Sequence, residues 1–350
     1  MKWKKLAAIV LSGALLLGTA GCGNDSAAGE NGGGDGSPSD VKIGVIIPGS
    51  PTDGGFCQQG AEAGEALKTT YGYDVRVIEA TPAETVRQEA ENMAADDFRI
   101  VFGHGGQCAS PFAEICEDYP DTWFVTFGGN EIRDNLFPVV MCAEEATYVQ
   151  GIVAAMMSQT GIIGTSLAGD YPAYTKTITA MELGAKSVNP EVEVLNAVLS
   201  AADPNECAEI TLNQIQSGAD MIFSNSNEGV SGAIKAVNES EGVYTFGYLG
   251  DYFDAAPGKV LLNIIGDYTK GYDLAAQTIL GDAPKADYIY LTIANDCVRI
   301  EWNEELKSEI PEDVIAAAEQ AIEDIKSGAI DVPNEYEQDK AQELLAEYDS

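Results

Sequence analysis

Short apolar runs alternate with longer amphipathic segments over most of the chain from Val41 onward. The apolar runs are VKIGVII, YDVRVIE, RIVFG, TWFVTF, PVVMCA, GIIGTSL, VEVLNAV, ADMIF, GVYTFGY and KVLLNII. The amphipathic segments between them include residues 61–70, 82–95, 144–159, 174–188, 206–217 and 270–280. Strands that are apolar throughout, separated by helices of this length, indicate parallel sheets covered on both faces. Because this part of the chain is also longer than a typical single core, the sequence predicts an α/β fold of two doubly wound parallel-sheet lobes.

The beginning of the chain has the pattern of a secretory signal. Three lysines precede an apolar run over residues 6–18, which is too short to cross a bilayer, and small residues lead to Cys22. We expect a signal peptide over residues 1–21 and a lipid on Cys22 that anchors the protein on the extracytoplasmic face of the cell membrane. An ordinary signal peptide with an incidental cysteine is the alternative. Residues 22–40 are rich in Gly, Ser and Asp and predict a flexible tether.

The charge balance excludes some partners. The chain has 56 acidic and 19 basic residues, with a formal net charge of −37. A body this acidic repels nucleic acid and anionic lipid, and no basic stripe offsets the repulsion. We therefore expect a small ligand that is neutral or cationic, or that is neutralised by local hydrogen-bond donors.

The loops that follow the strands are the expected place for a ligand, because ligands of doubly wound sheets gather beyond the carboxyl ends of the strands. The first such loop contains DGGFCQQG at residues 53–60, and GHGGQCASP at residues 103–111 is also rich in glycine. Neither loop has the Lys-Ser/Thr pair of a P-loop, and neither matches a dinucleotide fingerprint. A phosphate cradle is therefore disfavoured.

Phe56 is the notable residue of the first loop. An aromatic ring flanked by Asp53 and Gln58 provides a flat apolar face beside polar groups, which is how many small-molecule sites are built. The alternative is a hydrophobic staple that packs the first helix onto the sheet.

No catalytic machinery is visible in the sequence. His104 is the one histidine, so two-histidine metal sites are excluded, and no GxSxG motif is present. We therefore expect no enzyme activity, no metal and no cofactor. His104 itself either donates to a ligand or is satisfied by its own backbone neighbours.

Other polar and aromatic residues lie just past predicted strands, and each of them is either a ligand contact or only a turn former or helix cap. In the first lobe the candidate is Asn130, and in the second lobe the candidates are Tyr171, Asn225, Asn227, Tyr248 and Asp251.

Six cysteines follow Cys22, and no two of them form a CxxC pair, so a structural zinc site is not expected. An even number in an exported chain leaves both disulfides and free thiols open. The pair most favoured by loop position is Cys57 with Cys108.

Several longer motifs occur in order along the chain. They are TDGGFCQQGAEAG, CEDYPDTWFVTFGG, EEATYVQGIVAAMMSQTGIIG, ELGAKSVNPEVEV, SGADMIF and PEDVIAAAEQAIEDIKSGAI. Together with the lipoprotein-type start, they resemble the basic membrane protein (BMP) family of substrate-binding lipoproteins, from Val41 to about Val332.

The resemblance implies a type I periplasmic-binding-protein fold, in which two lobes joined by three crossings close over a ligand and deliver it to the permease and ATPase subunits of an ABC importer. Family members characteristically bind purine nucleosides, and one branch binds purine bases or related heterocycles. The implied first lobe comprises residues 41–140 and about 262–288. The second comprises residues 141–261 and about 289–332, followed by an acidic tail over residues 333–350, whose sequence favours a short helix.

The resemblance also assigns residues. Asp53 and Phe56 match the family's aspartate and stacking phenylalanine, and Asp251 matches an acidic residue after a later strand. Cys57, which we include among the ligand-binding residues, stands where many nucleoside binders have an asparagine.

Two further departures weaken a ribose-specific site. Ala201 and Ala202 replace a second aromatic residue, and Gly266 replaces a lysine. Each hydrogen bond missing to a buried ligand hydroxyl costs about 1–3 kcal/mol. We therefore expect a small neutral heterocycle, either a purine nucleoside or a nucleobase, with another heterocycle as an alternative. A sensor that presents its closed form to a membrane receptor is the alternative to an importer component.

Overall fold

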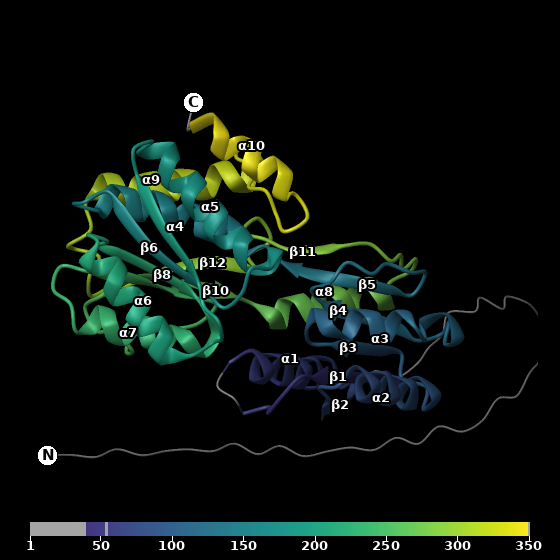
Figure 1. The fold of residues 1–350 in the computed structure, drawn as a ribbon. Coiled ribbons are helices and arrows are strands. Elements are labelled where there is room, and N and C mark those ends of the chain that lie inside the picture. Colours follow the sequence, from purple (N-terminus) through teal and green to yellow (C-terminus); the bar gives the residue numbers. More distant parts are fainter. Residues whose placement is uncertain (1–39, 53–54, 349–350) are drawn as a thin grey trace, which may run out of the picture. The chain divides into compact units, whose positions relative to one another are not determined.

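The computed structural model describes residues 40–52 and 55–348 (Figure 1). The predicted signal peptide, Cys22 and Asp53 lie outside the described residues. Within residues 40–52 and 55–348, none of the helices has both the length and the apolar character needed to cross a membrane.

The first lobe is built on a six-stranded sheet. In spatial order its strands are β11 (Ile289–Leu291), β5 (Leu136–Met141), β4 (Trp123–Phe127), β3 (Ile100–Gly103), β1 (Lys42–Ile47) and β2 (Asp74–Glu79). All neighbouring pairs are parallel. The inner strands β1, β3 and β4 are almost entirely buried, as expected for a sheet covered on both faces.

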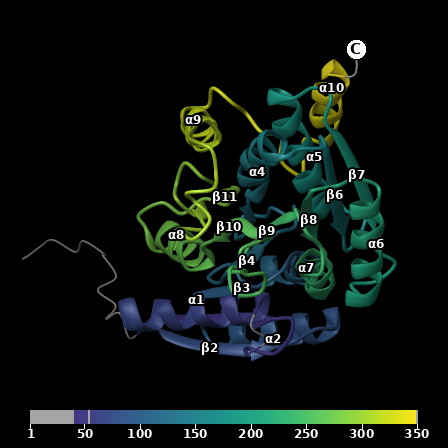
Figure 2. The same ribbon diagram turned by 90° about the vertical axis from the view of Figure 1, so that its left-hand side faces the viewer.

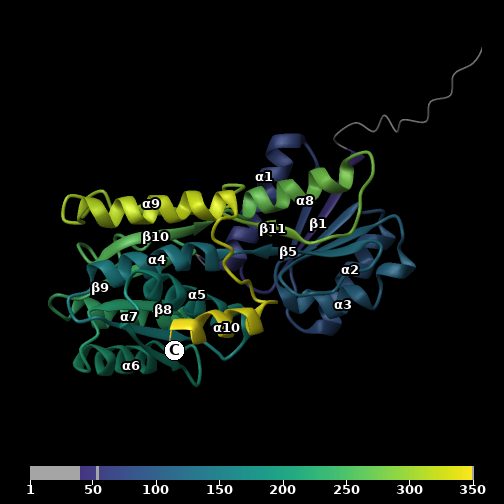
Figure 3. The same ribbon diagram turned by 90° about the horizontal axis from the view of Figure 1, so that it is seen from above.

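Helices cover both faces of this sheet (Figure 3). α1 (Phe56–Tyr71) packs beside α8 (Tyr268–Leu280) on one face, and α2 (Ala83–Ala95) packs beside α3 (Ala109–Ala113) on the other. Alternate residues of β1 show the division, because Val45 belongs to the core under α1 and α8, whereas Ile46 belongs to the core under α2 and α3. The predicted doubly wound arrangement is confirmed in this lobe.

The second lobe repeats the plan with another six-stranded sheet. Its strands, in spatial order, are β12 (Val298–Trp302), β10 (Val260–Gly266), β9 (Tyr244–Tyr248), β8 (Met221–Asn225), β6 (Ile162–Leu167) and β7 (Glu193–Val198). β12 is antiparallel to β10, whereas the other pairs are parallel. The chain between β10 and β12 passes through α8 and β11 of the first lobe before it returns to the second sheet.

One face of the second sheet carries α4 (Ala143–Met157), α5 (Pro172–Val188) and α9 (Glu312–Ser327), and the other carries α6 (Pro204–Gln216) and α7 (Val230–Asn238) (Figures 1 and 2). Two glycines allow α4 and α5 to touch backbone to backbone. A Cβ on Gly151 would overlap the carbonyl of Met181, and one on Gly184 would overlap the carbonyl of Tyr148. The helix crossing therefore requires glycine at both positions.

The chain passes between the lobes after β5, after β10 and after β11. These crossing points differ from two of the expected lobe boundaries. The boundary expected at about residue 262 lies inside β10, which belongs wholly to the second sheet. The boundary expected at about residue 289 also shifts, since the short strand β11 stays with the first sheet. The tail contains α10 (Gln338–Tyr348), which packs against α5 and confirms the predicted short helix.

Candidate functional site

The loops at the carboxyl ends of both sheets hold the candidate site. Phe56 begins α1 after β1, and His104 follows β3 directly. In the second lobe Tyr171 precedes α5 and Asp251 follows β9. The loops of the two lobes approach each other, since Gln59 on α1 donates from Nε2 to the carbonyl of Leu249 at 3.4 Å.

Phe56 is stacked on His104. The ring centroids lie 3.9 Å apart with an interplanar angle of 26°, and Phe56 keeps 39% of its surface exposed. The edge of Tyr268 contacts the Phe56 ring at a centroid distance of 5.6 Å. The ring is therefore held in place but remains available to a flat ligand.

His104 is a buried support for this ring, and none of its own surface is exposed. Its Nε2 lies 2.7 Å from the carbonyl oxygen of Phe56, and its Nδ1 lies 3.2 Å from the hydroxyl of Tyr272. A carbonyl only accepts, so Nε2 carries a proton and donates it. In the neutral ring Nδ1 then accepts from Tyr272. Gly60 makes room, because a Cβ there would lie 2.6 Å from the imidazole. This arrangement favours the alternative in which His104 is satisfied by its neighbours.

A cavity of about 150 Å³ lies beside this aromatic group, between the lobes. It is lined by Phe127, Gly128, Val139, Val140, Met141, Ala173, Lys176, Tyr248, Leu249, Tyr268 and Glu335. These residues come from the first sheet, from α5 and α8, from the end of β9 and from the C-terminal segment. Of the described residues that were proposed from the sequence, Tyr248 is the one that lines this cavity.

The phenols in the wall of the cavity are neutral. Burial raises the pKa of Tyr268 to about 12, and burial also raises the pKa of Tyr248. The cavity therefore offers aromatic faces together with hydroxyl groups that can donate or accept.

The charged groups at the cavity form a compact cluster. Lys176 is 5% exposed, and its ammonium lies 3.0 Å from Glu144 Oε2 and 3.2 Å from Glu335 Oε2. The ammonium also donates to the carbonyl of Met141 at 2.9 Å. Neither oxygen of Glu144 has a hydrogen bond of good geometry, so its contact with Lys176 is a close ion pair rather than a hydrogen bond.

The pKa values of this cluster reflect its burial. Burial lowers the pKa of Lys176, but Glu144 and Glu335 raise it by more, so the net direction is upward and the lysine stays charged. Burial raises the pKa of Glu144, although Lys176 opposes this shift.

The other described residues that were proposed from the sequence are not in the cavity wall. Cys57 is buried, Gln58 donates to Glu62 at 2.7 Å, and Asn130 is exposed. Tyr171 is 65% exposed.

The remaining polar candidates of the second lobe make contacts within that lobe. Asn227 donates to the hydroxyl of Tyr174 at 3.0 Å, and Asp251 accepts from Asn263 Nδ2 at 2.9 Å. Asn225 is buried.

Sequence reasoning missed Lys176 and Glu335. The signal for Lys176 was a single positive charge in an otherwise uncharged stretch of α5, YPAYTKTITA. Glu335 has no such signal, because it is one of several acidic residues in the tail.

Within the described parts of the chain the six cysteines are buried, and none of them forms a disulfide. The disulfide between Cys57 and Cys108, which was the favoured pair, is therefore not formed. Burial raises the pKa of Cys108 to about 12, which disfavours a reactive thiolate.

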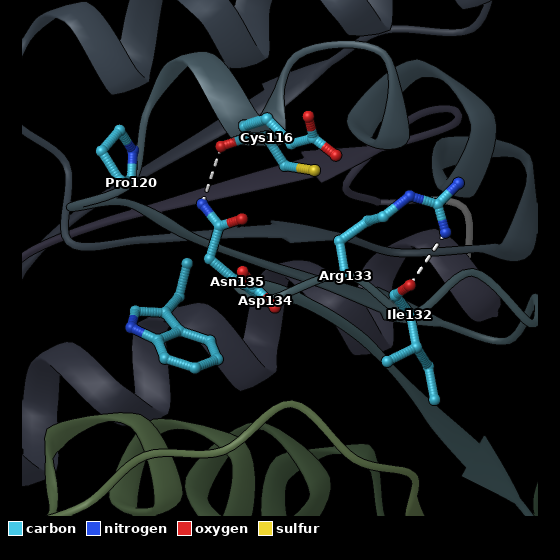
Figure 4. A pocket seen from close by; sticks show the side chains of 8 residues that line it. Cys116, Pro120, Ile132, Arg133, Asp134 and Asn135 are labelled. Carbon is cyan, nitrogen blue, oxygen red and sulfur yellow. Dashed lines mark hydrogen bonds between the residues drawn. The ribbon is translucent and has the colours of Figure 1, made fainter.

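A second hollow, of about 660 Å³, lies near the amino ends of β4 and β5 (Figure 4). Asn135, in its wall, donates to the carbonyls of Cys116, Tyr119 and Thr122 and so closes the turn before β5. Because ligands of such sheets bind at the opposite, carboxyl ends of the strands, we take the smaller cavity as the candidate site.

Comparisons with known proteins agree with this architecture. The model of the family described as "ABC transporter substrate-binding protein PnrA-like" (Bmp) matches residues 40–335. A purine-binding protein of Brucella abortus is 28% identical over 297 residues, which cover 83% of this chain and 82% of that protein. A putative ABC transporter glucose-binding protein of Haloferax volcanii is 26% identical, over 75% of this chain and 67% of that protein.

Among solved structures, a solute-binding protein of an ABC transporter system from Conexibacter woesei has a TM-score of 0.68 at 21% identity and covers 84% of this chain and 99% of its own. This likeness supports the fold, whereas the family match extends over most of the chain. The chain therefore belongs to the Bmp family of PnrA-like ABC-transporter substrate-binding proteins, as its motifs predicted.

Proposed function

We propose that this protein captures a purine nucleobase or nucleoside between its two lobes and delivers it to an ABC importer. The observation that carries the proposal is the aromatic-lined cavity between the lobes, at the carboxyl ends of both sheets. The family membership supports a solute-binding role, with permease and ATPase subunits as partners, rather than an enzymatic one. The purine-binding relative favours the purine class of ligand.

In this proposal the aromatic residues provide the surfaces on which the ligand stacks. Phe56 faces one ring of the ligand, and Tyr171 approaches when the lobes close. Asp53, Asn227 and Asp251 supply polar contacts at the edge of the ligand, together with Tyr248 in the cavity wall. A charge of −37 on the chain is consistent with a neutral ligand.

Titration calorimetry of the ligand-stripped protein tests the proposal. The ligands are adenine, guanine, hypoxanthine and the corresponding nucleosides, and glucose serves as the contrasting ring. We expect saturable binding of at least one purine that is much tighter than binding of glucose. Binding of no purine would refute the proposal.

A monosaccharide is the second candidate, because one relative is named as a putative glucose-binding protein. Tight glucose binding in the same titrations, without purine binding, would favour it. A sensory role predicts the same ligand but no uptake, so loss of labelled purine uptake in a deletion strain distinguishes import from sensing.

We also propose that a lipid on Cys22 anchors the protein outside the cytoplasm. The expected result is a protein that partitions with membranes and carries a diacylglyceryl mass on its N-terminal cysteine. A Cys22→Ser variant released into the soluble fraction supports the anchor, whereas unchanged membrane retention contradicts it.

A further inference from the structure

The segment between α9 and α10 contributes a residue to the cavity between the lobes. Glu335 is one of the lining residues, and its side chain is only 12% exposed. Shortly before it, Val332 is 9% exposed and belongs to the core of the second lobe. The segment is therefore fixed on the second lobe just before it reaches the cavity.

The same segment is also fixed on the first lobe. The hydroxyl of Tyr336 donates to the carbonyl of Gly129, which follows β4, at 2.7 Å. The ring of Tyr336 contacts that of Tyr288 at a centroid distance of 5.4 Å. After this bridge the chain enters α10, which packs along α5 (Figure 3). Contacts on both sides of Glu335 thus set the position of its carboxylate.

The orientation of Glu335 is set by Lys176. An ammonium has three protons to donate, and three oxygens surround this one within 3.2 Å, from Met141, Glu144 and Glu335. Oxygens of the protein itself therefore enclose this ammonium. Among the charged groups in the cavity wall, the acceptor is the carboxylate of Glu335.

We propose that Glu335 is a specificity-determining residue whose carboxylate accepts hydrogen bonds from N–H groups on one edge of the bound heterocycle. This inference rests on the proposed function of the cavity. An ionised carboxylate only accepts, so it favours ring N–H and amino groups and repels a ring edge of carbonyl or unprotonated nitrogen acceptors. The aromatic walls formed by Phe127, Tyr248 and Tyr268 suit the faces of the same ring.

The charge of the cluster supports this choice of ligand edge. Two carboxylates, Glu144 and Glu335, face one ammonium, so the cluster carries no excess of positive charge. An anionic ligand would be repelled by the two carboxylates beside this single ammonium. A neutral or cationic ligand whose edge carries N–H donors is not repelled in this way.

The first experiment uses the unmodified protein. Its affinities for adenine and guanine are compared with those for N6,N6-dimethyladenine and 1-methylguanine, in which N–H donors are replaced by methyl groups. If an N–H donor meets Glu335, methylation of that donor weakens binding by about 10- to 100-fold. Equal affinities within about twofold for both pairs overturn the inference.

The second experiment identifies Glu335 as the residue responsible. In Glu335→Gln we expect the parent base to bind about 10-fold more weakly, with much of the discrimination against its methylated form lost. Glu335→Asp keeps the charge and serves as a milder variant if the amide variant is unstable in a thermal melt. Glu343→Gln is the matched control, because Glu343 is an exposed residue of α10 and the substitution makes the same change in charge.

The outcomes separate the two proposals. A parent protein that binds purines, with the same affinity and discrimination in Glu335→Gln, overturns the role of Glu335 and leaves the proposed function standing. A parent protein that binds no purine overturns the proposed function, and the role of Glu335 falls with it.

Discussion

Removal of the buried lysine at the cavity should destabilise the protein strongly at neutral pH. In Lys176→Met the apolar part of the side chain is retained, but Glu144, whose side chain is 1% exposed, loses its cation. A buried carboxylate without a partner becomes protonated instead of staying charged. The cost of holding Glu144 neutral at pH 7, against an ordinary pKa of 4.5, is at most about 3.4 kcal/mol, and the parent protein already bears part of it because burial raises the pKa of Glu144 there as well. Loss of the donor to Met141 adds about 1 kcal/mol.

The pH dependence has a definite sign. In Lys176→Met the folded-state pKa of Glu144 lies far above its unfolded value. The folded protein therefore holds this proton more tightly than the unfolded chain, and the variant loses stability as pH rises above about 4.5. Relative to the parent protein, we expect a deficit of up to about 4 kcal/mol at pH 7 that shrinks to about 2 kcal/mol or less at pH 5.

Urea denaturation followed by far-ultraviolet circular dichroism measures this deficit at both pH values. The double variant Lys176→Met/Glu144→Gln should recover much of the loss at pH 7, because Glu144, the more deeply buried of the two carboxyl groups beside Lys176, is then replaced by a neutral amide. Lys307→Met is the matched control, since Lys307 forms a surface pair with Glu304 and its side chain is 41% exposed. We expect that control to change stability by less than about 1 kcal/mol. An equal deficit for Lys176→Met at both pH values would refute the reasoning.

Three further outcomes are expected. Phe56→Ala should weaken purine nucleoside binding by about 5- to 30-fold in calorimetry, with little change in melting temperature because the ring is partly exposed; unchanged affinity removes its stacking role. Burial raises the pKa of Glu145 to about 7 despite its hydrogen bond from the amide of Ile293, so stability should fall by up to about 3 kcal/mol as pH rises from about 4.5 through 7. Glu145→Gln should flatten this part of the pH profile in urea titrations, and an unaltered profile contradicts the shift. Gly184→Ala should lower the free energy of unfolding by about 1–3 kcal/mol or more in the same titrations, because the alanine methyl group pushes α5 away from the backbone of α4 at Tyr148. An unchanged free energy of unfolding contradicts the close approach of the two helices.

The strands that were predicted correctly share one property, which is burial on both faces. VKIGVII and TWFVTF are continuous apolar runs because helices cover both sides of β1 and β4. β12 was missed because its residues alternate between buried and exposed, and β11 was missed because it has three residues. Neither produces an apolar run, and the lobe boundary near β11 was misplaced for the same reason.

The loops of the site were predictable, but the directions of their side chains were not. A loop at the carboxyl end of a strand lies near the site in any doubly wound sheet. Tyr248 lines the cavity and Asn130 is exposed to solvent because of packing between segments that are distant in sequence. The Lys176–Glu335 pair, for example, joins α5 to a residue of the C-terminal segment. No local pattern encodes such a contact.

The position of Phe56 relative to the cavity provides a way to distinguish a base from a nucleoside. A cavity of about 150 Å³ is of the size that holds one small ring such as benzene. Phe56 is not in its wall, and Tyr268 lies between the two, 5.6 Å from Phe56 by ring centroids. A free base in the cavity should therefore depend on Glu335 and little on Phe56. A nucleoside is larger than a base by a ribose, so it can occupy the cavity and also extend past Tyr268 to Phe56. Its affinity should then fall in both Phe56→Ala and Glu335→Gln, with losses that add in the double variant because the two side chains contact different parts of the ligand.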